Sequence, residues 1–187
     1  MKIPIEVSAR HVHLSKKDLD ILFGENYELK KVKQLSQPSD FACEEVVDIE
    51  VNSKILKNLR VVGPVREKTQ VEISKTDAVF LGVNPPVNLS GNLEGSLPVK
   101  IIGPIGEIDL EQGLIIAKRH IHCSILEAEN IGLKNNDIVS VKIEGERGLI
   151  FENVIVRVKD GYKLSMHIDT DEGNAANINK ISEGEIL

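Results

Sequence analysis

The chain has 187 residues, a formal net charge of −6 and a pI of about 5.4, with 28% charged and 3% aromatic residues. An acidic chain with so few aromatic side chains lacks the basic surface and the stacking groups of nucleic-acid-binding proteins. No apolar run approaches the ~18 residues of a membrane-spanning helix, and the cysteines are too few for a disulfide framework, so we expect one or two domains in a reducing compartment.

Short segments rich in valine and isoleucine, broken by glycine, proline and asparagine, predict a chain made mostly of strands. In chain order, the expected strands are residues 3–7, 44–51, 59–62, 69–73, 99–102, 114–117, 138–143, 149–158 and 163–168. Residues 82–98 are expected to form an ordered loop. Many short strands with a few short helices are typical of small β-barrels capped by helices.

Four helices are expected where a serine or aspartate is followed three residues later by an acidic residue, the pattern of a capping box. The expected capping residues are Ser15, Ser74, Ser124 and Asp169. Glycine commonly ends a helix, and the glycines that would end the first three are Gly24, Gly82 and Gly132.

Four of the five histidines lie in two copies of one pattern, which indicates an internal duplication. The copies are Arg10-His11-Val12-His13-Leu14-Ser15 and Arg119-His120-Ile121-His122-Cys123-Ser124. Side chains alternate along a strand, so the two histidines of each copy share a face and can converge on one metal ion. Cys123 falls on the opposite face, and we interpret it as a buried apolar residue.

Glu72 and His167 each precede an expected helix cap by two residues, as His13 and His122 do. Five histidines and Glu72 make six candidate ligands, or three for each of two metal ions. A structural zinc site usually has four protein ligands, whereas three leave a position open for water or substrate. Zn²⁺ suits these ligands best, and Co²⁺, Ni²⁺ and Fe²⁺ remain possible. The alternatives are ordinary surface or core histidines and a solvent-facing Glu72.

Arg66 lies in Gly63-Pro64-Val65-Arg66-Glu67, and a similar turn, Gly103-Pro104-Ile105-Gly106-Glu107, has glycine in its place. A guanidinium binds phosphate through two donors, so Arg66 is a candidate phosphate ligand. The alternative is a solvated surface arginine. Arg10 and Arg119 are out of phase with the histidines and are expected to form ion pairs that support the metal ligands.

Taken together, the motifs resemble those of the PduL-type phosphotransacylases, or phosphate propanoyltransferases. The resemblance covers nearly the whole chain. It rests on residues 10–15, Leu35-Ser36-Gln37-Pro38, residues 63–66, 70–74, 119–124, 145–151 and 166–172. It implies a mainly β fold of two β-barrel domains with short capping helices and a metal site at their interface. Residues 1–9 plus 118–187 would form one domain, and residues 10–117 the other.

The resemblance also implies the roles of the site residues. One zinc ion would be held by His11, His13 and Glu72, and the other by His120, His122 and His167. Arg66 matches the phosphate-binding arginine of the family, and Ser90 matches a serine close to the substrate. The implied partners are acyl-CoA and inorganic phosphate, with coenzyme A as substrate or product, and the implied assembly is a homodimer.

The implied reaction interconverts a short-chain acyl-CoA plus phosphate with acyl phosphate plus CoA. The chain shows no obvious nucleophile–base pair, so we expect direct attack of phosphate on the thioester. The alternatives are a dizinc hydrolase, which would not need phosphate, and a non-enzymatic metal-binding module. The first expected strand begins close to Met1, without the N-terminal extension of relatives that enter microcompartments, so the expected location is the cytoplasm.

Overall fold

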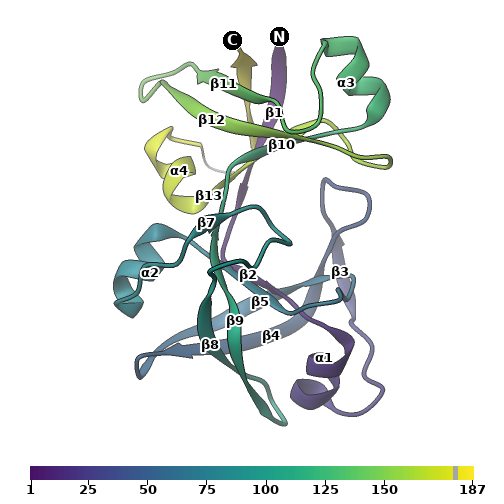
Figure 1. Cartoon of the computed structure of the whole chain (residues 1–187), viewed down its shortest axis with the longest axis vertical. Coiled ribbons are helices and arrows are strands. Elements are labelled where there is room, and N and C mark those ends of the chain that lie inside the picture. The colour runs from purple at the N-terminus through teal and green to yellow at the C-terminus, as the bar shows by residue number, and fades with distance from the viewer. Residues whose placement is uncertain (179–180) are drawn as a thin grey trace. The chain divides into compact units, whose positions relative to one another are not determined.

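The computed structural model describes residues 1–178 and 181–187 of a mainly β protein with four short helices in that part of the chain (Figure 1). The chain divides into two compact units. Unit 1 consists of Met1–Ala9, Ser36–Ser39 and Lys118–Leu187, and unit 2 consists of Arg10–Leu35 and Asp40–Ala117. Each unit is built around one β-barrel, as the short, turn-bounded strands of the sequence predict.

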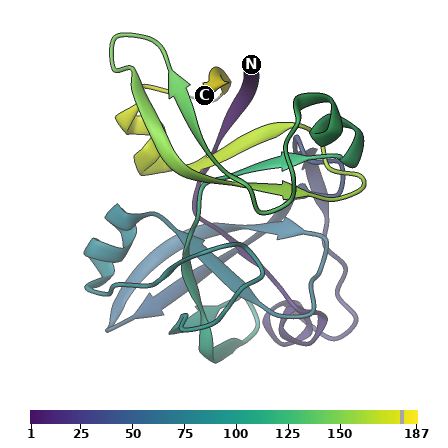
Figure 2. The same cartoon turned by 45° about the horizontal axis from the view of Figure 1, so that its top comes forward.

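The barrel of unit 1 is closed, with the strand order β1-β13-β10-β12-β11-β14. Its strands are β1 (Lys2–Ser8), β10 (His120–Cys123), β11 (Ile138–Ile143), β12 (Leu149–Val158), β13 (Ser165–Asp169) and β14 (Ile181–Ile186). The N-terminal strand pairs in parallel with β13 and antiparallel with β14, so the two ends of the chain lie side by side (Figures 1 and 2).

The barrel of unit 2 has the order β4-β5-β2-β6-β9, and β8 closes it by pairing with both β4 and β9. Its strands are β2 (His11–His13), β4 (Phe41–Val51), β5 (Lys54–Gly63), β6 (Gln70–Ile73), β8 (Leu97–Ile102) and β9 (Glu107–Ala117). Two further strands extend its edges, β3 (Lys31–Gln34) on β4 and β7 (Val87–Asn88) on β9.

The two barrels have the same pairing pattern. β2 is parallel to β5 and antiparallel to β6, just as β10 is parallel to β12 and antiparallel to β13. β9 then occupies in unit 2 the place that β1 occupies in unit 1. The duplication seen in the histidine motifs therefore extends over the whole barrel, but the last strand of the second copy comes from the beginning of the chain.

Each helix begins directly after the capping residue that the sequence predicts. The helices are α1 (Lys16–Phe23), α2 (Lys75–Leu81), α3 (Ile125–Ile131) and α4 (Thr170–Ala175). The caps Ser74, Ser124 and Asp169 form full capping boxes with the acid three residues on. The Ser15 side chain accepts from the backbone of Asp18, while its own N–H donates to Thr69 instead. Gly24, Gly82 and Gly132 end the first three helices, as expected.

Each barrel has its own apolar core, and one cysteine lies in each. Cys123 is fully buried in unit 1 and Cys43 in unit 2, so Cys123 packs inward as the alternation along its strand predicts. Burial raises the pKa of each thiol to about 11, which keeps both cysteines in the unreactive thiol form.

The expected strand ranges omit five strands of the described chain: β2 and β10, where only the alternation of the histidine motifs indicated a strand, and β3, β7 and β14. β3 is exposed along its whole length, so no alternation of apolar and polar residues marks it. β7 is a two-residue strand inside the expected loop 82–98. The expected domain division placed the whole of residues 10–117 in one domain, whereas Ser36–Ser39 pack with unit 1. Buried Gln37 donates from its amide to the Lys163 carbonyl at 2.8 Å and to Ser165 Oγ at 2.9 Å.

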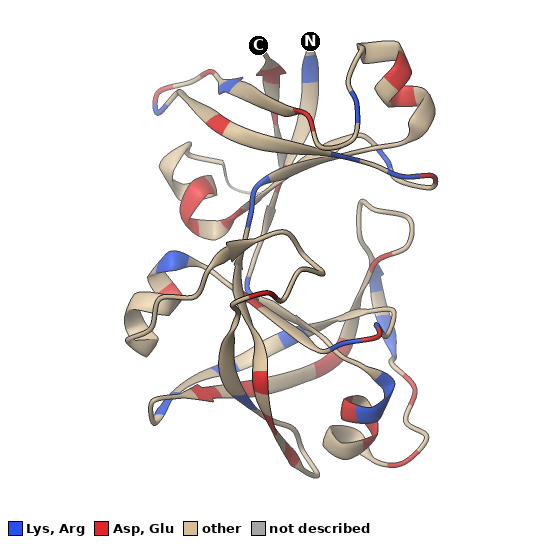
Figure 3. Ribbon diagram, in the orientation of Figure 1, with Lys and Arg blue, Asp and Glu red and all other residues tan. Residues whose placement is uncertain are grey.

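Positive and negative side chains are mixed along both units rather than gathered on one of them (Figure 3). Among the helices of residues 1–178 and 181–187, none has the length and apolar character needed to cross a membrane.

Candidate active site

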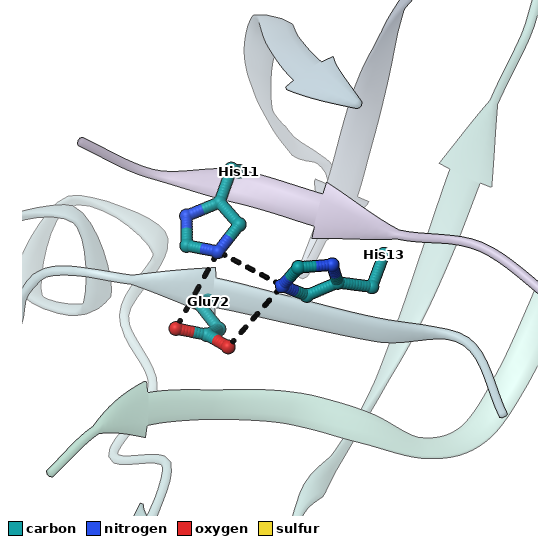
Figure 4. Close-up of side chains that lie close together, drawn as sticks. All are labelled: His11, His13 and Glu72. Carbon is teal, nitrogen blue, oxygen red and sulfur yellow. Dashed lines mark hydrogen bonds and ion pairs between the residues drawn. The ribbon is translucent and has the colours of Figure 1, made fainter. Parts of the chain in front are cut away.

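The clearest candidate metal site lies in unit 2, where β2 runs beside β6. His11 is directly opposite Glu72 in the antiparallel register, and His13 follows on the same face of β2. The three side chains point toward one another (Figure 4). His11 Nε2 lies 3.1 Å from His13 Nε2 and 3.6 Å from Glu72 Oε2, and His13 Nε2 lies 3.7 Å from Glu72 Oε1.

These spacings fit a bound metal ion. Ligand atoms about 2.0–2.2 Å from a tetrahedral ion lie roughly 3.3–3.6 Å from one another. Two imidazole nitrogens and a carboxylate oxygen that face one point at 3.1–3.7 Å therefore have the spacing and the chemistry of a three-ligand zinc site. The strand register supplies this geometry, because it places Glu72 opposite the first histidine of the pair.

The protonation states of this cluster also suit a cation. Burial, followed by the neighbouring His11 and Arg66, lowers the pKa of His13 well below its ordinary value, so the ring is neutral at physiological pH. Its Nδ1 lies 3.0 Å from the Val62 carbonyl, which can only accept, so the proton sits there and Nε2 presents its lone pair. Burial would raise the pKa of Glu72, but the imidazoles, a Ser90 hydrogen bond and the Arg66 charge lower it.

The second set of candidate ligands lies in unit 1. His120 is opposite His167 in the register of β10 and β13, the same relation that joins His11 and Glu72. The ring centroids of His120, His122 and His167 lie 4.6–5.5 Å apart. Within the described residues, however, only the unit 2 cluster brings three ligand atoms within 4.8 Å of one another. The structure thus gathers the three rings, and a second metal ion stays a prediction.

Arg66 and Ser90 belong to the same unit as the first cluster and lie in direct contact. The Arg66 guanidinium donates to Ser90 Oγ at 2.9 Å. The amide of Gln70 donates to the same hydroxyl at 3.0 Å and to Glu72 Oε1 at 2.6 Å. A continuous hydrogen-bond network therefore joins the candidate phosphate ligand to the candidate metal ligand. Gln70 was not among the predicted site residues, although its position two residues before Glu72 on one strand places both side chains on the same face.

Comparison with known proteins gives a consistent result. The family model for phosphate propanoyltransferase matches residues 4–179. The phosphate propanoyltransferase of Thermotoga maritima is 54% identical over 178 residues, which is 95% of this chain and 85% of the relative. That of Clostridioides difficile is 48% identical over 99% of this chain and 88% of the relative, and that of Salmonella typhimurium is 47% identical over 93% and 83%.

The chain belongs to the phosphate propanoyltransferase family. It is an acyltransferase enzyme, and the family resemblance read from its motifs is confirmed.

Within this phosphate propanoyltransferase fold, the arginine that precedes each His-x-His pair forms a matching ion pair. Arg10 contacts Asp77 at 2.5 Å in unit 2, and Arg119 contacts Glu172 at 2.7 Å in unit 1. Asp77 and Glu172 are each the third residue of a helix, α2 and α4 respectively. Each of these helices follows the strand that carries the third candidate ligand of its unit. The expected ion pairs are confirmed, and each joins the start of a histidine strand to the helix that follows the neighbouring strand.

The contrast between Arg66 and Gly106 has a steric cause. A Cβ atom added to Gly106 would lie 2.5 Å from the Ile21 carbonyl oxygen at the end of α1, so no side chain fits there. The structural counterpart of Arg66 is instead Lys159. The Arg66 N–H donates to the carbonyl of Leu14, one residue after the first His-x-His pair, and the Lys159 N–H donates to the carbonyl of Cys123, one residue after the second.

Proposed function

We propose that this acyltransferase moves a short acyl group, propanoyl or acetyl, between coenzyme A and inorganic phosphate. The names of the relatives support the reaction class. The observation that carries the proposal is the network in unit 2 from Arg66 through Ser90 and Gln70 to Glu72. This network joins Arg66, whose guanidinium fork would bind phosphate, to the candidate metal ligand Glu72. An enzyme that uses both phosphate and a metal needs the two groups to be held close together in this way.

We further propose that His11, His13 and Glu72 hold one zinc ion and that His120, His122 and His167 hold another. Bound zinc would act as a Lewis acid that polarises a carbonyl or phosphoryl oxygen. Both trios occupy the same register positions in their barrels, which supports equivalent roles for them. The homodimer implied by the resemblance stays a prediction, and light scattering of the purified protein would test it.

The residues of the chain itself would act on the phosphate. The guanidinium of Arg66 would orient it through two parallel hydrogen bonds, and Ser90, held by Arg66 and Gln70, would form the adjacent wall. Fixing the nucleophile beside the thioester supplies much of the rate enhancement of a two-substrate reaction.

The proposed step is a direct transfer. An oxygen of HPO₄²⁻ forms a bond to the thioester carbonyl carbon, the C–S bond breaks, and the proton of the phosphate ends on the thiol of CoA. No side chain is acylated, and the sum of charges and electrons is unchanged. The reverse direction uses the same contacts.

The test is CoA release from propanoyl-CoA and acetyl-CoA, with and without phosphate, with acyl phosphate trapped by hydroxylamine. Phosphate-dependent release with matching acyl phosphate supports the transferase. CoA release that ignores phosphate would identify a hydrolase, and metal binding without turnover would identify a binding module. Arg66→Ala should weaken the phosphate-dependent release of CoA. Lys68→Ala, an exposed cation two residues away, is the matched control.

A further inference from the structure

Gln70 is buried on β6, with 2% of its surface exposed, and every polar group of its side chain is used. Its Nε2 donates to Glu72 Oε1 at 2.6 Å and to Ser90 Oγ at 3.0 Å, and its Oε1 accepts from the backbone N–H of Gly91 at 2.8 Å. The residue thus spans from a candidate metal ligand to the Ser90–Gly91 turn beside Arg66.

The orientation of this amide follows from its partners. A backbone N–H can only donate, so Gly91 requires the carbonyl oxygen of Gln70 on its side. The two amide protons must then face the other way, where Glu72 and Ser90 take one each. A flipped amide would place an oxygen against the carboxylate and an NH₂ group against the Gly91 N–H. One geometry is therefore strongly favoured.

This contact holds the carboxylate of Glu72 in place. Gln70 bonds to Oε1, the oxygen that faces His13, which leaves Oε2 directed toward His11. Removing the amide would leave a buried carboxylate oxygen without this donor and free the group to rotate. At the other end, Gly91 has a φ of +97°, a left-handed conformation, and its bond to Gln70 helps to keep Ser90 against Arg66.

We propose that Gln70 is a positioning residue that couples the metal ligand Glu72 to the phosphate-binding group of Arg66 and Ser90. This inference rests on the proposed function, because it assigns the two ends of the network to metal and phosphate. It requires metal affinity and phosphate use to change together when Gln70 changes, although the side chain touches neither the metal nor the phosphate.

The other barrel has a related arrangement at the matching position. Gln70 is opposite His13 in the register of unit 2, and Ser165 is opposite His122 in unit 1. Ser165 Oγ lies 3.0 Å from His167 Nε2, and the Gln37 amide donates to Ser165 at 2.9 Å. In each unit, a glutamine amide therefore supports the third candidate ligand, directly in unit 2 and through a serine in unit 1.

The decisive variant is Gln70→Met, which keeps the length and volume of the side chain and removes its hydrogen bonds. Gln112→Met, on the exposed part of β9, is the control for the chemical change. In a His120→Ala background that leaves the unit 2 ligands intact, Zn²⁺ affinity is measured by competition with a chromophoric chelator. We expect Gln70→Met to weaken it by about 10- to 100-fold, the usual effect of removing a hydrogen-bond partner of a metal ligand. The control should stay within about twofold.

The second measurement is the KM for phosphate in the otherwise unaltered chain, with the KM for acyl-CoA beside it. We expect the first to rise with Gln70→Met and the second to stay nearly constant. In a Ser90→Ala background, the same change should raise the phosphate KM by a smaller factor, because the link is already broken. If Gln70→Met raised the phosphate KM by the same factor with and without Ser90→Ala, the two residues would act independently and the inference would be wrong. An unchanged Zn²⁺ affinity in the Gln70→Met variant would also overturn it.

If Gln70→Met does not fold, Ser90→Ala carries the test alone, since it should weaken both Zn²⁺ and phosphate binding by several-fold. Loss of phosphate use with unchanged Zn²⁺ affinity would overturn the inference. The chelator measurement needs no acyl-CoA, so it stands apart from the proposed function. If the unaltered chain released no CoA in response to phosphate, the proposed function would fail while the effect of Gln70 on metal affinity could still be seen.

Discussion

The two barrels share their strand pairing and differ in the chemistry placed on it. The third candidate ligand is Glu72 in unit 2 and His167 in unit 1, at the same register position opposite the first histidine of each pair. Histidine binds a metal as the neutral imidazole, so as ligands the unit 2 trio would carry one negative charge and the unit 1 trio none. A divalent ion would then leave about one positive charge in unit 2 and two in unit 1. A duplicated backbone has thus kept the positions of its candidate ligands while the residue types at one position diverged.

The cation beside each trio differs as well. Arg66 donates through its guanidinium to Ser90, whereas its counterpart Lys159 is exposed, with its ammonium 5.9 Å from the Tyr162 ring centroid. Tyr162 in turn stacks on His122, with 4.3 Å between the ring centroids. Unit 2 therefore presents a guanidinium fork held against Ser90, and unit 1 presents an aromatic ring and an exposed ammonium group. In the proposed function, phosphate therefore binds in unit 2.

The largest effects should follow removal of a third ligand. Glu72→Ala and His167→Ala should each reduce bound zinc from about two ions per chain to about one. Each should also lower activity by more than about 10- to 100-fold, which is the usual effect of removing a residue that only hydrogen-bonds to a metal ligand. Elemental analysis of protein purified without chelator, beside the CoA-release assay, measures both. Two retained ions in either variant would show that the trio had been assigned wrongly.

An exchange variant tests whether the two trios can hold a metal in the same way. Glu72→His gives unit 2 the three-histidine set of unit 1, so it should keep near-normal zinc while activity falls, because Gln70 loses its carboxylate acceptor. Loss of the ion would mean that the carboxylate charge, rather than the number of ligands, holds the metal in unit 2.

The next effect in size concerns the two cations. Arg66→Ala should raise the phosphate KM or lower kcat/KM by about 10- to 150-fold, the equivalent of a charge-assisted hydrogen bond of roughly 1.5–3 kcal/mol. Arg66→Lys should recover part of this, because it keeps the charge without the fork. Lys159→Ala should change neither value by more than about threefold, and zinc content should stay normal in all three. A similar phosphate defect in the Lys159 variant would contradict the assignment of phosphate to unit 2.

A smaller effect is expected from the buried cysteines. Cys123→Ala and Cys43→Ala each remove one fully buried sulfur from a barrel core, and each should lower the free energy of unfolding by about 1–2 kcal/mol. Zinc content and activity should be retained, since neither thiol faces the ligands. Chemical denaturation gives the stabilities. Loss of zinc from the Cys123 variant alone would show that its side chain takes part in the metal site.

The smallest effect concerns the matched ion pairs. Arg10→Ala and Arg119→Ala should each lower the free energy of unfolding by about 0.5–1 kcal/mol, since the arginines are partly exposed and solvent weakens such pairs. Thermal unfolding should show similar losses for the two variants, because the pairs occupy equivalent places. A much larger loss in one of them would mean that the barrels differ in how their histidine strands are held.

Features that depend on near neighbours in the chain could be predicted from the amino-acid sequence. The capping boxes at Ser74 and Ser124 are readable because cap and acid lie one helical turn apart. The alternation along a strand separates Cys123 from its flanking histidines for the same reason. The repeated arginine–histidine motif also indicated the duplication, because both copies keep the same spacing.

Contacts between segments far apart in the chain could not be predicted in this way and are visible only in the folded protein. Strand register placed Glu72 opposite His11, and β1 closed a barrel made from the far end of the chain. Folding also brings Gln37 into contact with Ser165, and Gln70 into contact with Ser90. The partners in each contact lie far apart in the chain, so no local spacing pattern predicts them. The physical reason is that backbone pairing and buried hydrogen bonds depend on segments brought together by the whole barrel, whereas caps and alternation depend on residues a few positions apart.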